Sequence, residues 1–429
     1  MMKKLTFVLF SLLIIFTSCS KNKDEITRPR VQIINPPAFS VFSAGETILV
    51  EASVYHEKTV RSVQAALVND DNIPVCAPVG ATPNQNVFQI DFELEIDNPG
   101  IISGNYFIMV KASDEESTTR TFQPVEIKGI PVELRRLLVI TRLNTLKSNI
   151  YFIDSAYNIN HILGINKEFA GSAVSSEYQQ LYYISPEPSR LLTYNLEDTL
   201  LAWDYNALLP YPILEDVSFA ENLVYVASQN GDIKGLNSAG QIIYGTPTHS
   251  DRVPEKIFRH HNFIIADQRT RSDMYRYFVV FYSATGAFAN QFRSDLEVVS
   301  FFSRSENEII AFGNENDQAK IIVYGIEENN GLEPAAMPTG KLLYGIQINE
   351  NEVLLAMDYG VIKYNIQTFQ YNQVFEHDEV ISMDYDTLNQ FLSIARNNKI
   401  FFYNYPGASL LHTVTMDEPV LNIHFLYNK

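Results

Sequence analysis

The sequence predicts an all-β protein in two parts, a small β-sandwich followed by a ring of seven repeats. Two observations lead to this prediction. Short runs of alternating apolar and polar residues, typical of strands with one buried face, continue through the chain from residue 31. From residue 137 these runs also repeat at intervals of 39 to 46 residues, which predicts a repeat architecture.

The first residues predict export with a lipid anchor. Lys3 and Lys4 precede an apolar run over residues 5–16, which is too short to span a bilayer. The run ends at two small residues, Thr17 and Ser18, followed by Cys19. This arrangement resembles the lipobox of bacterial lipoprotein precursors, which implies that residues 1–18 are a signal peptide and that Cys19 becomes diacylated. An uncleaved anchor and an ordinary secretory signal with a chance cysteine are the alternatives.

Residues 19–30 are predicted to be a flexible tether because they begin with the polar run Ser20-Lys21-Asn22-Lys23-Asp24-Glu25. A lysine followed by two acids close behind the lipid-bearing cysteine also resembles the surface-export signal of some Gram-negative lipoproteins. That resemblance implies a position outside the cell. A plain solvated linker is the alternative.

The composition limits the classes of partner. The chain of 429 residues with 46% hydrophobic content is long enough for two packed domains. Its formal charge of −18 repels nucleic acid and anionic membrane surfaces, so we expect neither as a partner, and the lipid on Cys19 as the membrane attachment. The other cysteine is Cys76, so we expect neither an intramolecular disulfide nor a four-cysteine zinc site.

Residues 31–129 predict the sandwich. Turn-rich clusters at 69–72 and 97–100 separate alternating runs such as 47–54 and 88–96. The segment 103–114 resembles the penultimate strand of immunoglobulin-like (Ig-like) modules, which implies that the ring of Tyr106 lies in the core and its hydroxyl binds nearby backbone. Asp70, Asp71 and Asp114 are conceivable calcium ligands, but they lack EF-hand spacing, and turn formation explains them equally well.

Residues 137–429 predict the ring. In seven places an apolar or aromatic strand ends in a small polar turn residue: Asp154, Asn195, Asn237, Ser283, Gly325, Asn365 and Asn404. A second strand recurs upstream of each, and this period with several strands per unit is typical of β-propeller blades. The first repeat has three predicted strands (137–141, 149–154 and 158–164), whereas residues 420–427 form a strand left over at the end. We therefore expect a seven-bladed propeller in which the last strand completes the first blade and removes the open sheet edges.

The ring resembles WD40-like and quinoprotein-like propellers in period and strand count alone. No Trp-Asp ends the third strands, no Gly-His opens the repeats, and the single tryptophan, Trp203, does not match the repeated tryptophans of quinoprotein blades. The resemblance implies no quinone cofactor.

No catalytic or metal motif is found. The sequence has no Gly-x-Ser-x-Gly elbow, no His-Glu-x-x-His and no phosphate-binding glycine loop, so we expect no enzyme, cofactor or metal. His260 and His261 are adjacent, and neighbouring side chains on a strand point to opposite faces, so we predict a structural role. A propeller glycosidase or lyase is the alternative, and it requires acids such as Asp154, Asp216, Asp358 or Asp384 to converge on the channel.

Binding suits the residues present better than catalysis. The segment 267–277 contains three arginines and two tyrosines, a local basic patch on an acidic protein. Because arginine and tyrosine are enriched at binding hot spots, we predict contact residues in Arg269, Arg271, Tyr275 and Arg276. A second candidate is an aromatic platform for sugars or peptides made of Trp203, Tyr205 and Tyr211. A solvated loop and a core position for Trp203 are the alternatives.

A lipid-anchored propeller resembles two groups of proteins, the accessory lipoprotein of the outer-membrane barrel-assembly machinery and the surface lipoproteins encoded beside nutrient importers. This predicts a non-catalytic binding protein of the outer membrane, exposed at the cell surface and accessory to uptake. Its propeller face would engage a protein partner or a glycan or peptide nutrient. The alternatives are a periplasm-facing scaffold for outer-membrane protein assembly or secretion, and the glycosidase or lyase.

Overall fold

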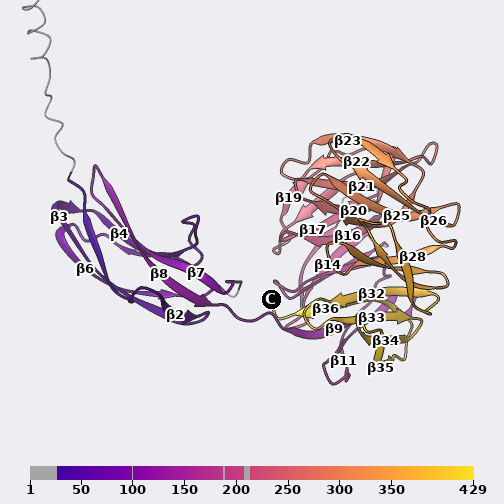
Figure 1. Ribbon diagram of the computed structural model, residues 1–429, viewed down its shortest axis with the longest axis horizontal. Helices are drawn as coiled ribbons and strands as arrows, with labels where there is room; N and C mark the ends of the chain where they lie inside the picture. Colours follow the sequence, from indigo (N-terminus) through magenta and orange to yellow (C-terminus); the bar gives the residue numbers. More distant parts are fainter. Residues whose placement is uncertain (1–26, 99, 187–188, 207–212) are drawn as a thin grey trace, which may run out of the picture. The chain divides into compact units, whose positions relative to one another are not determined.

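The computed structural model describes residues 27–429 except 99, 187–188 and 207–212. The chain divides into two compact units, Met1–Pro131 and Val132–Lys429 (Figure 1). Within the described ranges the regular elements are all strands, which confirms the predicted all-β class. The same ranges hold no helix long and apolar enough to cross a membrane.

The first unit consists of two sheets that share one hydrophobic core. The three-stranded sheet has the order β1 (Arg30–Asn35), β3 (Thr47–Val60), β6 (Gln85–Glu95). The five-stranded sheet has the order β2 (Ser40–Ser43), β8 (Thr118–Lys128), β7 (Gly104–Ser113), β4 (Ser62–Val68), β5 (Val79–Ala81). Alternate residues of β3 and β7, such as Ile48, Val50, Ile108 and Val110, are fully buried between them. The period-two pattern of the sequence therefore gives the inner faces of this unit.

Tyr106 of β7 has the position that the sequence predicts. Its side chain is buried, and its hydroxyl donates a 3.0 Å hydrogen bond to the carbonyl oxygen of Ile102. Asp114 forms the turn after β7, where its carboxylate accepts the backbone N–H of Glu116 at 2.7 Å and lies 2.6 Å from Nε2 of buried His56. Among the described residues no cluster of three or more His, Cys, Asp and Glu side chains suits a metal ion.

The second unit consists of antiparallel four-stranded sheets consistent with propeller blades, seven of them within the described residues. The strands of these sheets lie at the positions that the sequence repeats predict. The sheets run as follows: β11 (Ile159–Ile165), β10 (Lys147–Ile153), β9 (Leu134–Asn144), β36 (Val420–Tyr427); β12 (Gly171–Ser175), β13 (Gln180–Ser185), β14 (Arg190–Asn195), β15 (Leu201–Asn206); β16 (Leu214–Ala220), β17 (Leu223–Ser228), β18 (Ile233–Leu236), β19 (Ile242–Gly245); β20 (Arg252–His260), β21 (Phe263–Thr270), β22 (Arg276–Tyr282), β23 (Phe288–Ser294).

The remaining three sheets continue the same pattern. They are β24 (Glu297–Ser303), β25 (Glu308–Glu315), β26 (Gln318–Gly325), β27 (Asn330–Leu332); β28 (Leu342–Gln347), β29 (Glu352–Met357), β30 (Gly360–Asn365), β31 (Tyr371–Phe375); and β32 (Val380–Asp386), β33 (Phe391–Arg396), β34 (Lys399–Asn404), β35 (Ser409–Thr415).

The polar residues that mark the repeats form the turns after the third strands. Oδ1 of Asp154 accepts the backbone N–H groups of Ala156 and Asn158, both at 2.9 Å. Asn237 and Asn365 accept backbone N–H groups two to four residues ahead in the same way. Short Asp and Asn side chains can bond the backbone just ahead of them, which explains why these residue types recur there.

The two ends of the second unit meet in one sheet. β36 pairs antiparallel with β9, with Phe425 opposite Leu137, as the leftover strand predicts. Figure 1 shows β36, in yellow, beside β9, in purple. The first strands of successive sheets contact one another in the cycle β12, β16, β20, β24, β28, β32, β36 and back to β12. We call these seven the inner strands.

Candidate functional site

Six inner strands share an irregularity at the same place. The register shifts by one residue near the start of β16, β20, β24, β28, β32 and β36. Such a bulge redirects the side chain that follows it. We call the six following residues, all of them polar, the axial cluster: Asp216, Lys256, Ser300, Tyr344, Ser382 and Asn422.

Hydrogen bonds of the axial cluster join neighbouring inner strands. Nζ of Lys256 lies 3.1 Å from Oδ1 of Asp216, whose Oδ2 accepts the N–H of Ile257 at 3.0 Å. Ser382 Oγ donates to Asn422 Oδ1 at 2.6 Å, and Asn422 Nδ2 donates to Ser172 Oγ at 3.0 Å. The cluster therefore helps to hold the ring together.

Lys256 is the most accessible charged member. Its side chain is 42% exposed although it lies on an inner strand, whereas Asp216 is 15% exposed. The Asp216 carboxylate is the main reason why the pKa of Lys256 is raised, so the ammonium stays protonated. Burial raises the pKa of the Tyr344 phenol, which also hydrogen-bonds to Ser382 and interacts electrostatically with Asp384, Lys256 and Asp216. Groups from four inner strands therefore lie within electrostatic range of one another.

Asp384 and His424 lie further along the inner strands. Asp384 accepts the N–H of Phe425 at 2.6 Å and that of Tyr385 at 2.8 Å, and burial raises the pKa of its carboxyl to about 7. Burial lowers the pKa of His424 to about 4, and its Nε2 lies 2.8 Å from Ser172 Oγ. Of the four acids considered from the sequence, Asp216 and Asp384 are thus on inner strands, whereas Asp154 and Asp358 are in turns.

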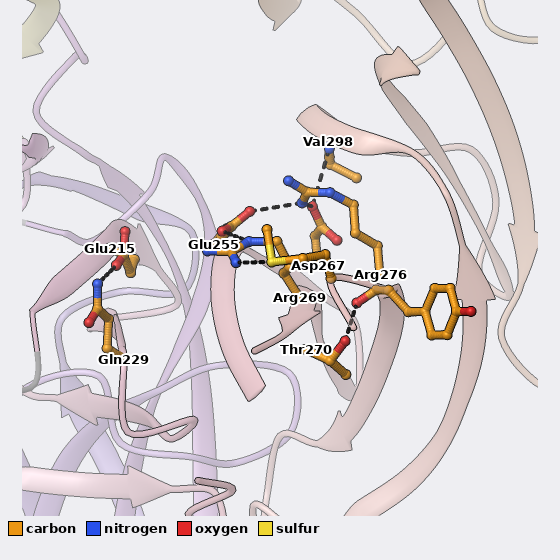
Figure 2. A network of polar contacts seen from close by, with 10 residues as sticks. Glu215, Gln229, Glu255, Asp267, Arg269, Thr270, Arg276 and Val298 are labelled. Atoms are coloured by element: carbon orange, nitrogen blue, oxygen red, sulfur yellow. Dashed lines mark hydrogen bonds and ion pairs between the residues drawn. The ribbon is translucent and has the colours of Figure 1, made fainter. Parts of the chain in front are cut away.

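A charged network lies beside the axial cluster on β20, β21 and β22 (Figure 2). Glu255 accepts Arg269 Nε at 2.6 Å and Arg276 Nη1 at 2.8 Å, and Arg276 also lies 2.7 Å from Oδ2 of Asp267. Burial raises the pKa of Asp267 to about 7 despite the opposing effect of Arg276. Because Asp267 also accepts the N–H of Val298 at 3.2 Å, the network joins two neighbouring sheets.

Further contacts fix the loop 271–275, which joins β21 to β22. The backbone N–H of Thr270 donates to the carbonyl oxygen of Tyr275 at 2.8 Å, and the Thr270 hydroxyl donates to the carboxylate of Asp273. Arg271 Nη2 donates to the carbonyl oxygen of Gln229 at 2.6 Å, and the side chain of Gln229 donates to Glu215. The loop is therefore attached at its base and to the neighbouring sheet.

The four residues predicted in this loop region have different surroundings. Arg276 is 13% exposed and Arg269 is 27% exposed, and both are neutralised by acids of the same chain. Tyr275 is 40% exposed, with the Arg293 guanidinium carbon 3.7 Å from its ring centroid, and Met274 beside it is 58% exposed. All five residues of the loop 271–275 are exposed, the polar Arg271, Ser272 and Asp273 as well as Met274 and Tyr275, and the role of the loop in contact stays a prediction.

The second predicted site is mostly packed. Trp203 Nε1 donates to the carbonyl oxygen of Ser238 at 2.7 Å, and Trp203 and Tyr205 pack against the core between two sheets. This favours the core position for Trp203. Tyr211, and the lipidation candidate Cys19, lie outside the described residues.

The argument from alternation was wrong for His260 and His261. Their ring centroids lie 4.5 Å apart, because β20 ends at His260 and His261 turns with φ of 46°. The ring nitrogens of His260 lie 2.9 Å from Ser303 Oγ and 3.0 Å from the carbonyl oxygen of Glu306. These contacts join His260 to the neighbouring sheet, and the structural role of the pair stays a prediction.

The axial cluster was missed from the sequence. The sequence does contain a pattern for it at the start of the inner strands: an apolar residue, then any residue, then a polar residue. Leu214-Glu215-Asp216 and Val380-Ile381-Ser382 are examples. Aligning the seven repeats on their first strands, rather than on their third-strand turns, would have brought these residues into one column.

Comparison with known proteins gives no family. No protein-family model matches the sequence, and no curated protein matches it. Among the solved structures that are similar is the "Crystal structure of the computationally designed Ika8 protein: crystal packing No.1 in P63", at 12% identity and a TM-score of 0.49. The similarity covers 69% of this chain and 92% of that chain. At these values it carries no argument about function.

Proposed function

We propose that this chain is a non-catalytic binding protein, anchored to the outer membrane by lipid on Cys19 and exposed at the cell surface. In this proposal the first unit is an Ig-like spacer and the second is a seven-bladed propeller. One face of the propeller engages a protein partner or a nutrient. The seven four-stranded sheets, the cycle of inner strands and the Tyr106 contact with Ile102 support the finer description of the fold.

The observation that carries the proposal is the construction of the loop 271–275. The strands on either side of it carry ion pairs of low exposure, and the N–H of Thr270 donates to the carbonyl oxygen of Tyr275 at 2.8 Å across its base, while the side chains of Met274 and Tyr275 are exposed. A loop that is already ordered loses less conformational entropy on binding, so its contacts contribute more to affinity. Tyrosine adds a large contact surface with few rotatable bonds. This combination favours a docking role.

Site-specific photo-crosslinking in cells tests this role. A benzoylphenylalanine at Tyr275 is compared with one at Tyr282, which is 47% exposed at the other end of β22. We expect a discrete crosslinked product from position 275 and none from position 282. Equal products from both positions, or none from either, would contradict docking through this loop.

Two alternatives have distinct signatures. A periplasm-facing assembly scaffold would be protected from external protease. A glycosidase or lyase gains some support because Asp216 and Asp384 both lie on inner strands, but their oxygens already accept Lys256 or backbone N–H groups. That alternative predicts release of new reducing or unsaturated sugar ends, abolished in Asp216→Asn.

A further inference from the structure

We propose that a pocket between the first and the last sheet of the second unit binds a small, uncharged aromatic compound. The pocket, which we call the seam pocket, has a volume of about 260 Å³. The apolar part of its wall is formed by Leu137, Ile153, Tyr157, Phe391, Phe402 and Phe425. The inference goes beyond the proposed function, because the pocket lies at the start of the second strand β9, whereas the loop 271–275 follows the end of the second strand β21.

The seam pocket lies where the first sheet lacks a connection. In the other six sheets a short turn joins the inner strand to the second strand, such as residues 387–390 between β32 and β33. In the first sheet the corresponding strands, β36 and β9, are the two ends of the unit, so they pair without a turn to join them. The exposed residues Arg135 and Ser155 belong to the lining, so the pocket opens to solvent.

The charged groups of the lining favour an uncharged ligand, because they already have partners. The Asp154 carboxylate accepts backbone N–H groups of its own turn. Arg135 is ion-paired with Glu197, and the guanidinium carbon of Arg136 lies 3.6 Å from the ring centroid of Phe152. A charged ligand would therefore lose hydration on entering without gaining a free opposite charge among these groups.

The wall of the pocket favours an apolar ligand over water. Leu137, Ile153, Phe402 and Phe425 are buried members of the core between the two sheets. An ordered water needs about two to four polar partners, which these side chains do not supply. A cavity of about 150 Å³ with such a lining can hold one benzene ring, so the volume of the seam pocket suits one or two fused rings.

The aromatic side chains of the wall favour an aromatic ligand over an aliphatic one. Tyr157, Phe391, Phe402 and Phe425 supply four rings. Tyr157 meets Phe402 close to edge-on, with ring centroids 5.0 Å apart, and its other contact is a stack on His412 at 4.2 Å. Aromatic rings in such arrangements attract one another beyond the area that they bury, so a further ring in the pocket would gain the same attraction.

Titration of the full mature chain with small probes tests the inference. Indole is compared with its charged relatives indole-3-acetate and tryptamine, and benzyl alcohol with its saturated counterpart cyclohexylmethanol. Isothermal calorimetry and saturation-transfer NMR measure the binding. We expect saturable binding of indole, weaker binding of both charged relatives, and weaker binding of cyclohexylmethanol than of benzyl alcohol.

Tyr157→Gly removes one ring of the wall and should weaken indole binding about tenfold. We expect this variant to fold, because the φ of 63° at Tyr157 favours glycine, and Gly240 and Gly286 hold the corresponding turn position in two other sheets. Phe369→Gly is the matched control. Phe369 also has a positive φ, 60°, at the corresponding position before β31, and it is not part of the pocket wall. This control should bind indole as the wild type does.

Urea unfolding followed by the fluorescence of Trp203 checks that each variant is folded. If Tyr157→Gly is not, Leu134→Phe carries the test, because a larger side chain at this lining position narrows the pocket and should also weaken indole binding. Four results would each overturn the inference: no saturable binding of indole, equal or tighter binding of a charged relative, equal binding of benzyl alcohol and cyclohexylmethanol, or the same indole affinity in the folded pocket variant as in Phe369→Gly.

Discussion

Phe425→Ala tests whether the C-terminal strand closes the ring. Phe425 lies on β36, opposite Leu137 of β9, and its side chain is 5% exposed in the core that it shares with Leu137 and Val139. Replacing a buried phenylalanine by alanine costs about 3–5 kcal/mol of unfolding free energy, through lost burial and the cavity that remains. A domain is typically stable by about 5–15 kcal/mol, so the loss is large.

The assay is urea unfolding followed by the fluorescence of Trp203. Trp203 is the single tryptophan of the chain and lies on β15, so it reports on the second unit at a sheet that does not contain Phe425. If the unfolding free energy falls by about 3 kcal/mol per molar urea, the urea concentration at the midpoint of unfolding should fall by roughly 1 M or more. The control is Phe288→Ala on the outer strand β23, where the side chain is 53% exposed, and it should change stability by less than about 1 kcal/mol.

Removal of residues 420–429 deletes β36 altogether and should abolish the cooperative transition at Trp203. The reasoning is refuted if Phe425→Ala and Phe288→Ala have the same midpoint. It is also refuted if the truncated chain unfolds as the wild type does, because the ring would then not depend on this strand.

Two further predictions concern pH and the first unit. The raised pKa of Asp384 (about 7) makes the folded state less stable as pH rises from about 4 to 7, whereas the lowered pKa of His424 (about 4) makes it less stable as pH falls from about 6.5 to 4. The melting temperature is measured between pH 4.5 and 7 for each variant and the wild type. It should rise more with pH in Asp384→Asn than in the wild type, and less in His424→Gln. Curves parallel to that of the wild type would contradict both pKa shifts. Tyr106→Phe removes the bond to Ile102 and should cost about 1 kcal/mol, read as faster hydrogen exchange in β7, while Tyr55→Phe, 49% exposed, should not change it.

The parts of the fold that depend on short-range patterns were predictable. Asp154, Asn237 and Asn365 mark the turns because a short side chain bonds the backbone a few residues ahead, and such local chemistry is visible in the sequence. The position of Tyr106 was implied by the resemblance of its segment to Ig-like modules, and its hydroxyl bonds the carbonyl oxygen of Ile102, four residues away. The pairing of β36 with β9 was predictable only because a strand was missing from the first repeat and left over at the end.

The candidate site was less predictable because its contacts depend on how the strands pair. Arg269 and Arg276 form a basic patch in the sequence, but the pairing of β20, β21 and β22 places Glu255 and Asp267 against them. The axial cluster depends on one-residue bulges, and alternation alone does not show where a strand gains a residue. Asp154 was already predicted to be a turn residue, but Asp216 and Asp384 could not be distinguished from Asp358 until each was placed on an inner strand or in a turn.

The central claim is that a lipid on Cys19 carries the binding units outside the cell. Protease treatment of intact cells tests it most directly, with Cys19→Ala as the control for the anchor and a periplasmic protein as the control for an intact outer membrane. The account predicts that the chain is lost from intact cells, and that Cys19→Ala is no longer found with the membrane. Protection of the chain until the outer membrane is opened would contradict surface exposure and favour the periplasmic scaffold.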